Sequence, residues 1–238
     1  ARFHGDDGLD IGARPYVDQP TPGLYGTFWD GMTLAAGTHV VDGDITIPPG
    51  RTLVLEPGAH LQTATTDVMK GYRDQTRIEL RIQGALDVQG TSGTPVVVDS
   101  SGTSRTSWWG IDLQSTATCS INGREVSEAY YGLYYDAATD LPATGVSAHT
   151  VQTAGIYVRT GHHTLSDITV TGSADHGIWV DSAGQVSVDV CLLYSNTDYG
   201  IYLSNNTTAT STFEHCTLQD NYYGLYANTS RGTQTYTL

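Results

Sequence analysis

Several kinds of residue are scarce in this sequence, and each shortage argues against a class of protein. Lys70 is the only lysine, charged residues make up 15% of the 238 residues, and the formal net charge is −14. Such a chain is a poor partner for nucleic-acid phosphates or an anionic membrane surface. No apolar run reaches the ~18–20 residues of a membrane-spanning helix. We therefore expect no nucleic-acid partner and no membrane span.

Cysteine and helix-forming residues are scarce too. The three cysteines are too few for a disulfide scaffold, and their spacing matches no zinc-ribbon pattern. The residues that favour helices are outnumbered by Gly, Ser, Thr, Asp and Tyr. This composition predicts an all-β chain of strands and turns.

Glycine, in contrast, is abundant and periodic. Six glycines that each precede a short alternating strand recur at steps of 22, 23, 22, 23 and 24 residues: Gly110, Gly132, Gly155, Gly177, Gly200 and Gly224. This period is too short for helical hairpins or propeller blades and fits one turn of a solenoid. Because one repeat cannot bury its own apolar face, the coils must stack. We predict a right-handed, single-stranded parallel β-helix with about 22–24 residues per coil, its hand given by the crossover rule for parallel strands.

Alignment of the repeats places apolar residues in three inward columns, which predicts a triangular core. The columns are Ile111, Leu133, Ile156, Ile178, Ile201 and Leu225; Ile121, Val146, Leu165, Val188 and Phe213; and Val126, Val151, Val170, Leu193 and Leu218. His149 aligns with Cys191 and Cys216, and we expect it to be a hydrogen-bonded core histidine. The two cysteines lie one coil apart, and stacked thiols and a disulfide both remain open.

The repeats do not extend over the whole chain. Residues 1–36 hold Gly, Pro and Asp without sustained periodicity, which predicts an irregular N-terminal leader or cap. Residues 37–238 are the expected β-helix. Within it, residues 63–77 interrupt the pattern and carry Lys70, Arg73 and Arg77, which predicts a loop that leaves one coil.

Four sequence segments carry a resemblance to a known family. They are VVDGDITIPPGRTLVLEPGAHL, LDVQGTSGTPVVVDSS, SWWGIDL and the GIYV, GIWV and GIYL units. Over about residues 37–235, the chain resembles the right-handed parallel β-helix repeat proteins of bacterial secreted and surface proteins. The resemblance implies the fold and an extracellular location. It leaves the function open, because the same coil carries pectin lyases, polygalacturonases, epimerases, tailspikes, adhesins and inert stalks.

The residue sets that carbohydrate chemistry needs are incomplete. Pectate-lyase-type sites need clustered acidic calcium ligands beside an Arg or Lys, and only Asp175-His176-Gly177 is similar to a polygalacturonase motif. Asp175 and Asp198 occupy similar places in adjacent coils and could stack ~5 Å apart, as paired glycosidase carboxylates do. Stacked turn aspartates also occur in solenoids without catalysis. We assign no catalytic residue, no metal ligand and no cofactor, with Ca²⁺ left open.

Aromatic residues give the strongest functional signal. We define the aromatic face as two outward rows of Tyr and Trp: Tyr134, Tyr157, Trp179, Tyr202 and Tyr226 in the middle of the glycine strands, and Trp109, Tyr131, Tyr199 and Tyr223 just before the glycines. His176 takes the same place in its own repeat. Such a strip is explained either by strand propensity and cross-strand stacking or by a contact surface, because these rings suit sugars and partner proteins.

These features together favour a secreted or cell-surface structural or adhesive module. Its partners would be copies of itself, assembled into a filament or surface layer through the aromatic face and uncapped ends, or a polysaccharide. Two alternatives remain open: a polysaccharide lyase or glycoside hydrolase, and a non-catalytic carbohydrate-binding module.

Overall fold

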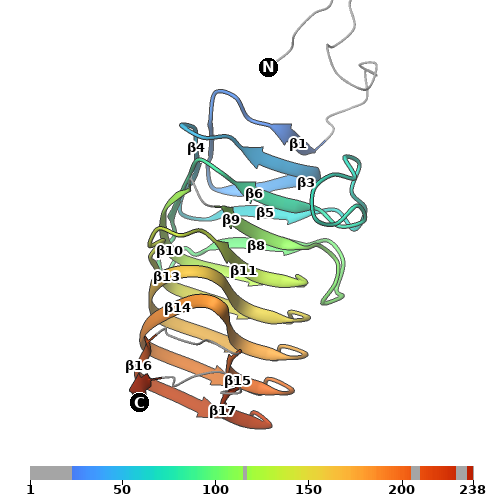
Figure 1. The fold of residues 1–238 in the computed structure, drawn as a ribbon. Coiled ribbons are helices and arrows are strands. Elements are labelled where there is room, and N and C mark those ends of the chain that lie inside the picture. Colours follow the sequence, from blue (N-terminus) through green and yellow to red (C-terminus); the bar gives the residue numbers. More distant parts are fainter. Residues whose placement is uncertain (1–22, 115–116, 205–209, 229–234, 238) are drawn as a thin grey trace, which may run out of the picture.

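The described part of the chain consists of strands that wind around one axis. The computed structural model describes residues 23–114, 117–204, 210–228 and 235–237. Every strand pairing in these residues is parallel, from β1 with β3 at one end to β16 with β18 at the other. The result is a column of about eight turns without a helix (Figure 1). The prediction of an all-β parallel β-helix is confirmed. Within these residues, no helix is long and apolar enough to cross a membrane.

Eighteen strands build the column. They are β1 (Leu24–Thr27), β2 (Met32–Leu34), β3 (Gly37–Ile47), β4 (Thr52–Leu55), β5 (Ala59–Thr63), β6 (Glu79–Ile82), β7 (Ala85–Gln89), β8 (Val96–Ser100), β9 (Gly110–Gln114), β10 (Thr118–Ser127), β11 (Tyr131–Asp136), β12 (Ala143–His149), β13 (Ala154–Thr171), β14 (His176–Tyr194), β15 (Tyr199–Leu203), β16 (Thr210–Gln219), β17 (Tyr223–Ala227) and β18 (Thr235–Thr237).

Strands start before the expected boundary at residue 37. β1 pairs with β3, and β2 pairs with β4, so residues 24–34 already contribute to the coils. Residues 1–22 of the expected leader lie outside the described residues. Residues 64–78, between β5 and β6, contain no strand and project from the column near its N-terminal end (Figure 1).

The core is a set of apolar columns whose members are one coil apart. The first predicted column has the expected register from Ile111 to Leu225. Its members from Ile111 to Ile201 are no more than 1% exposed. Alternation along each strand turns every second side chain inward, and the stacked coils bury what one coil cannot.

The register of one coil differs from the prediction by three residues. Ala143, not Val146, stands between Ile121 and Leu165, and Ala148, not Val151, stands between Val126 and Val170. Val146 is also the residue that precedes Ile168 and Cys191 in their column. His149 therefore does not align with Cys191 and points outward, where its Nε2 lies 2.6 Å from a Glu125 carboxylate oxygen.

Backbone conformation at a bend explains this difference. Gly123 and Gly145 both have left-handed φ values, 53° and 63°, and stand just before Arg124 and Val146. Asp167 holds the same place one coil later, with φ of 52°. The bend, and not the position of the nearest valine, therefore fixes the register of each coil.

Two of the three cysteines form a disulfide bond between adjacent coils. Cys191 and Cys216 are paired in register, with 4.4 Å between their Cα atoms. Cys119 is a free thiol.

Candidate functional site

The aromatic face is built by register. Tyr134, Tyr157, Trp179, Tyr202 and Tyr226 are aligned one above the other on β11, β13, β14, β15 and β17. The row before the glycines aligns as Tyr131, Ala154, His176, Tyr199 and Tyr223. β15 and β17, which carry its last members, stack at the C-terminal end of the column in Figure 1. The sequence-predicted residues are thus brought together on one side of the molecule.

The rings of this face contact one another from coil to coil. The ring centroids are 4.8 Å apart for Tyr134 and Tyr157, and 4.7 Å for Tyr157 and Trp179. Further along, Tyr202 and Tyr226 stack at 5.8 Å with an interplanar angle of 14°. Such distances are those of favourable aromatic pairs. The face is therefore one continuous surface of rings.

Polar groups border the rings. The Tyr157 hydroxyl donates to the Asp181 carboxylate at 2.7 Å, and the Trp179 Nε1–H donates to the Ser204 hydroxyl at 3.2 Å. Ser204 in turn donates to Asp181 at 2.8 Å. This hydrogen bonding fixes ring orientation and leaves oxygen atoms beside the ring surface.

Exposure rises steeply along the face. Tyr134 and Tyr157 are each only 7% exposed, whereas Tyr223 and Tyr226 are 48% and 40% exposed. Tyr222, beside them, is 75% exposed. Tyr134 and Tyr157 are therefore covered rather than outward as predicted, and the C-terminal end is the most exposed part of the aromatic face among the described residues.

Arg73, from the loop at residues 64–78, covers the N-terminal part. Its guanidinium carbon lies 4.8 Å from the centre of the Tyr134 ring and 5.9 Å from that of Trp109, in cation–π geometry. Its Nε donates to the buried Asp112 carboxylate at 3.0 Å, and its Nη2 donates to Asp136 at 2.7 Å. The loop is thus fixed to the column through one residue that bridges two coils.

Buried carboxylates fix the base of the same loop. Asp44 accepts backbone N–H groups from Glu79 and Gly71, and Glu79 accepts those of Arg73 and Asp74. Burial raises the pKa of Asp44 to about 6 and that of Glu79 to about 7. All four carboxylate oxygens have backbone partners, so these groups shape the loop.

Asp175 and Asp198 are also brought together. The Asp198 backbone N–H donates to the Asp175 carbonyl at 2.9 Å, one coil away. The pKa of Asp175 is raised, first by burial and then by the negative charge of Asp198. Both precede aromatic-row positions, His176 and Tyr199. A raised pKa is what a general acid needs, so Asp175 is the candidate acid at this place.

One triad in the described residues brings metal-capable groups together. Ligand atoms of Asp189, Glu214 and His215 lie within 4.8 Å of one another, and all three side chains are exposed. Calcium prefers six or more oxygen ligands, and an imidazole does not match that preference. The prediction was no cofactor with Ca²⁺ left open, and it stays a prediction.

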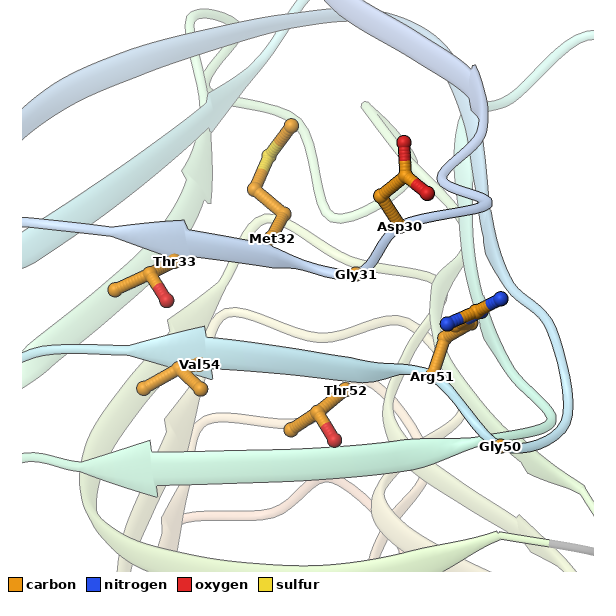
Figure 2. Close-up of a pocket in the computed structure, with 8 residues that line it drawn as sticks. All are labelled: Asp30, Gly31, Met32, Thr33, Gly50, Arg51, Thr52 and Val54. Atoms are coloured by element: carbon orange, nitrogen blue, oxygen red, sulfur yellow. The ribbon is translucent and has the colours of Figure 1, made fainter. Parts of the chain in front are cut away.

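A depression on the outer surface of the first coils is a weaker candidate. Figure 2 shows its lining on and beside β2 and β4: Asp30, Gly31, Met32, Thr33, Gly50, Arg51, Thr52 and Val54. Its two charged side chains, Asp30 and Arg51, are exposed, and it contains no aromatic ring. It offers less contact surface than the aromatic face.

The Arg73 bridge is a feature that the repeat pattern did not predict. Asp112 aligns with Tyr134, so it occupies a position of the aromatic column. A carboxylate in a column of aromatic residues was the signal in the sequence that a basic residue from another segment pairs with it. Which basic residue supplies it depends on the path of the loop, and that path has no repeat pattern to align.

Comparison with known proteins shows the family but does not suggest an activity. No curated protein and no solved structure matches this chain. A family model described as the right-handed beta helix region matches residues 85–237, more than half of the chain and most of the coils described above. With its parallel pairings and stacked apolar columns, the chain belongs to the right-handed β-helix family.

Proposed function

We propose that this protein is an extracellular adhesive module that binds a neutral polysaccharide through the exposed part of its aromatic face. The observation that carries the proposal is the continuous ring surface ending in Tyr222, Tyr223 and Tyr226, which are 75%, 48% and 40% exposed. Exposed tyrosine rings suit contact with the C–H groups of sugars, and their hydroxyl groups can hydrogen-bond to sugar hydroxyls.

The geometry of the rings supports an extended ligand. Tyr199 and Tyr223 stack at 5.6 Å, and Tyr202 and Tyr226 stack at 5.8 Å, with nearly parallel planes in both pairs. Successive coils thus repeat the same platform along the axis. A chain of similar units, such as a glycan, can contact successive platforms.

The net charge supports a neutral ligand, and the disulfide bond supports an extracellular location. The net charge of −14 disfavours a polyanionic glycan and makes copies of the chain repel each other, whereas a neutral glycan is unaffected. The Cys191–Cys216 disulfide supports an oxidising, extracellular location, because such bonds are rare in the cytosol.

Affinity electrophoresis in gels that contain neutral or anionic polysaccharides tests the proposal. Replacing Tyr223 and Tyr226 together by alanine should weaken binding at least about tenfold and leave the far-UV circular dichroism unchanged. Tyr25→Ala is the matched control, because Tyr25 is 44% exposed but lies on β1, far from this face along the column. Equal binding by the double variant and the parent would refute the proposal.

Self-association is the competing use of the same face. Electron microscopy and light scattering of the purified chain separate it from glycan binding. If the parent chain forms filaments and the Tyr223 and Tyr226 double variant does not, the partner of this face is a second copy of the chain and not a glycan.

A second candidate, glycoside hydrolysis, is favoured by the Asp175 and Asp198 pair. The raised pKa of Asp175 suits a general acid, and Asp198 could act as its partner carboxylate. Sugar release from a polysaccharide panel that is lost in Asp175→Asn but kept in Asp189→Asn would support it. No release by the parent chain, with or without calcium, would exclude it for that panel.

A further inference from the structure

An arginine side chain lies inside the β-helix. Arg124, on β10, pairs in register with Val96 and Val146, which are both inward and no more than 1% exposed. Arg124 itself is only 2% exposed. Its Nε, Nη1 and Nη2 atoms have no hydrogen-bond partner among the residues that the structure describes. A buried guanidinium normally has several partners, because it carries five N–H donors.

A second unpartnered group belongs to the same interior. Tyr135, on β11, is 0% exposed and aligns with Leu113 and Val158 in an inward column. Its hydroxyl is also without a partner in the described part of the chain. Tyr135 and Cys119 are the ionisable groups near enough to Arg124 to affect its pKa. The unsatisfied groups of this interior are therefore rich in donors.

Neither neighbour supplies a negative charge at neutral pH. Burial raises the pKa of the Cys119 thiol to about 12 and also raises that of the Tyr135 hydroxyl, so both stay neutral. Burial lowers the pKa of Arg124 only to about 10, so the guanidinium stays charged. An uncompensated buried charge carries a large free-energy penalty.

The nearby histidine has no acceptor to offer either. The His163 ring lies 4.6 Å from that of Tyr135 and is fully buried. Its Nδ1 accepts the Leu141 backbone N–H at 3.1 Å, which leaves Nε2 to donate to the Thr160 carbonyl at 2.9 Å. Both ring nitrogens are used, and the site still needs an acceptor with negative charge.

We propose that Arg124 and Tyr135 bind a small monovalent anion, of the size of chloride, in the interior of the β-helix. The adjacent coil has Ala143 and Ala148 where the next coil has Leu165 and Val170. Ala143 and Ala148 are the register partners of Ile121 and Val126, which lie three and two residues from Arg124 on β10, and these small side chains favour a monatomic ion. The ion accepts the guanidinium and phenol hydrogen bonds and balances the buried charge. Its role is to stabilise the middle of the column, and it does not depend on the proposed glycan binding.

Thermal unfolding at constant ionic strength tests this proposal. Sodium chloride is exchanged for sodium gluconate, whose anion is too large for the interior. When chloride exceeds its Kd about 100-fold, the midpoint of the parent chain should rise by about 5–10 °C. Arg124→Met should remove the response, and its midpoint in gluconate should equal or exceed that of the parent, because no buried charge remains. Arg51→Met, at an exposed arginine, should keep the full response.

Two further measurements keep the test decisive if Arg124→Met fails to fold. Tyr135→Phe removes only the hydroxyl and should weaken the chloride response while keeping the core packed. Crystals of the parent soaked in bromide should show an anomalous peak within hydrogen-bond distance of Arg124. Equal chloride responses in parent and variants, or no bromide peak beside Arg124, would overturn the proposal.

Discussion

Replacing Arg73 by alanine should release the loop at residues 64–78 from the column. Arg73 is the one cation that contacts the Asp112 carboxylate, which is 0% exposed, among the residues described. Breaking a buried ion pair by removing one partner is destabilising by about 3–5 kcal/mol. A third of the Arg73 side chain remains in contact with water, so we expect a smaller loss, about 2–3 kcal/mol. The bond to Asp136 adds little, because Arg159 also binds that carboxylate.

A double-mutant cycle measures this contribution directly. Urea unfolding, followed by circular dichroism, gives the free energies of unfolding of Arg73→Ala, Asp112→Asn and the double variant. We expect a coupling energy of about 1–3 kcal/mol, because Asp112→Asn removes the charge that Arg73→Ala leaves unpaired. Arg159→Ala, which removes only the exposed bond to Asp136, should lower stability by less than about 1 kcal/mol.

Limited trypsin digestion reports on the loop itself. In Arg73→Ala, cleavage after Lys70 and Arg77 should become faster, because the loop loses its bridge to two coils. The reasoning is refuted if Arg73→Ala is as stable as the parent, if the two substitutions are additive, or if the loop is cut at the parental rate.

Three further predictions concern the core, the turns and the pH dependence. Ile178→Ala should lower the free energy of unfolding by about 2–5 kcal/mol in urea titrations, and a loss below about 1 kcal/mol would argue against its burial in a packed column. Asn196→Ala should lower it by about 1–3 kcal/mol in the same titrations, because it leaves the Ser173 backbone N–H without its 3.0 Å acceptor, and unchanged stability would contradict this role. Folding raises the pKa of Asp44 to about 6 and that of Glu79 to about 7, so the native state binds more protons than the unfolded state between pH 8 and 5. The free energy of unfolding should therefore rise as the pH falls from 8 to 5, by about 2–4 kcal/mol for the two groups together. Glu79→Gln should flatten this dependence, and an unchanged pH profile in that variant would contradict the assignment.

The sequence predicts those parts of the molecule that repeat. The glycine steps specify the coil length, and the alternation after each glycine specifies which side chains turn inward. The aromatic face follows from the same register, so its alignment from Tyr134 to Tyr226 is confirmed. Its use as a contact surface stays a prediction.

Parts that interrupt the repeat were not predictable in the same way. For the coil that contains Val146, the predicted register was three residues away from the observed one, because the prediction aligned apolar residues. The glycine at position 145, with its left-handed φ, fixes the observed register. Exposure within the aromatic face could not be read from spacing, because a loop residue, Arg73, covers Tyr134. Arg124 occupies a core position, but an alignment of apolar residues does not find it, because its side chain is charged.

The polar interior at Arg124 and Tyr135 should be the weakest level of the β-helix whenever no anion is bound there. Each coil beyond Gly110 contacts only the coils directly before and after it. The register partners are 22 to 25 residues apart, as for Ile121 and Ala143 or Val188 and Phe213. In such a one-dimensional stack, the weakest interface sets how far order spreads. At the level of Arg124, a charged group replaces aliphatic contact in one of the inward columns, whereas the column from Ile111 to Leu225 continues through this level. Without a bound anion, we therefore expect the solenoid to separate first at this level under heat or denaturant.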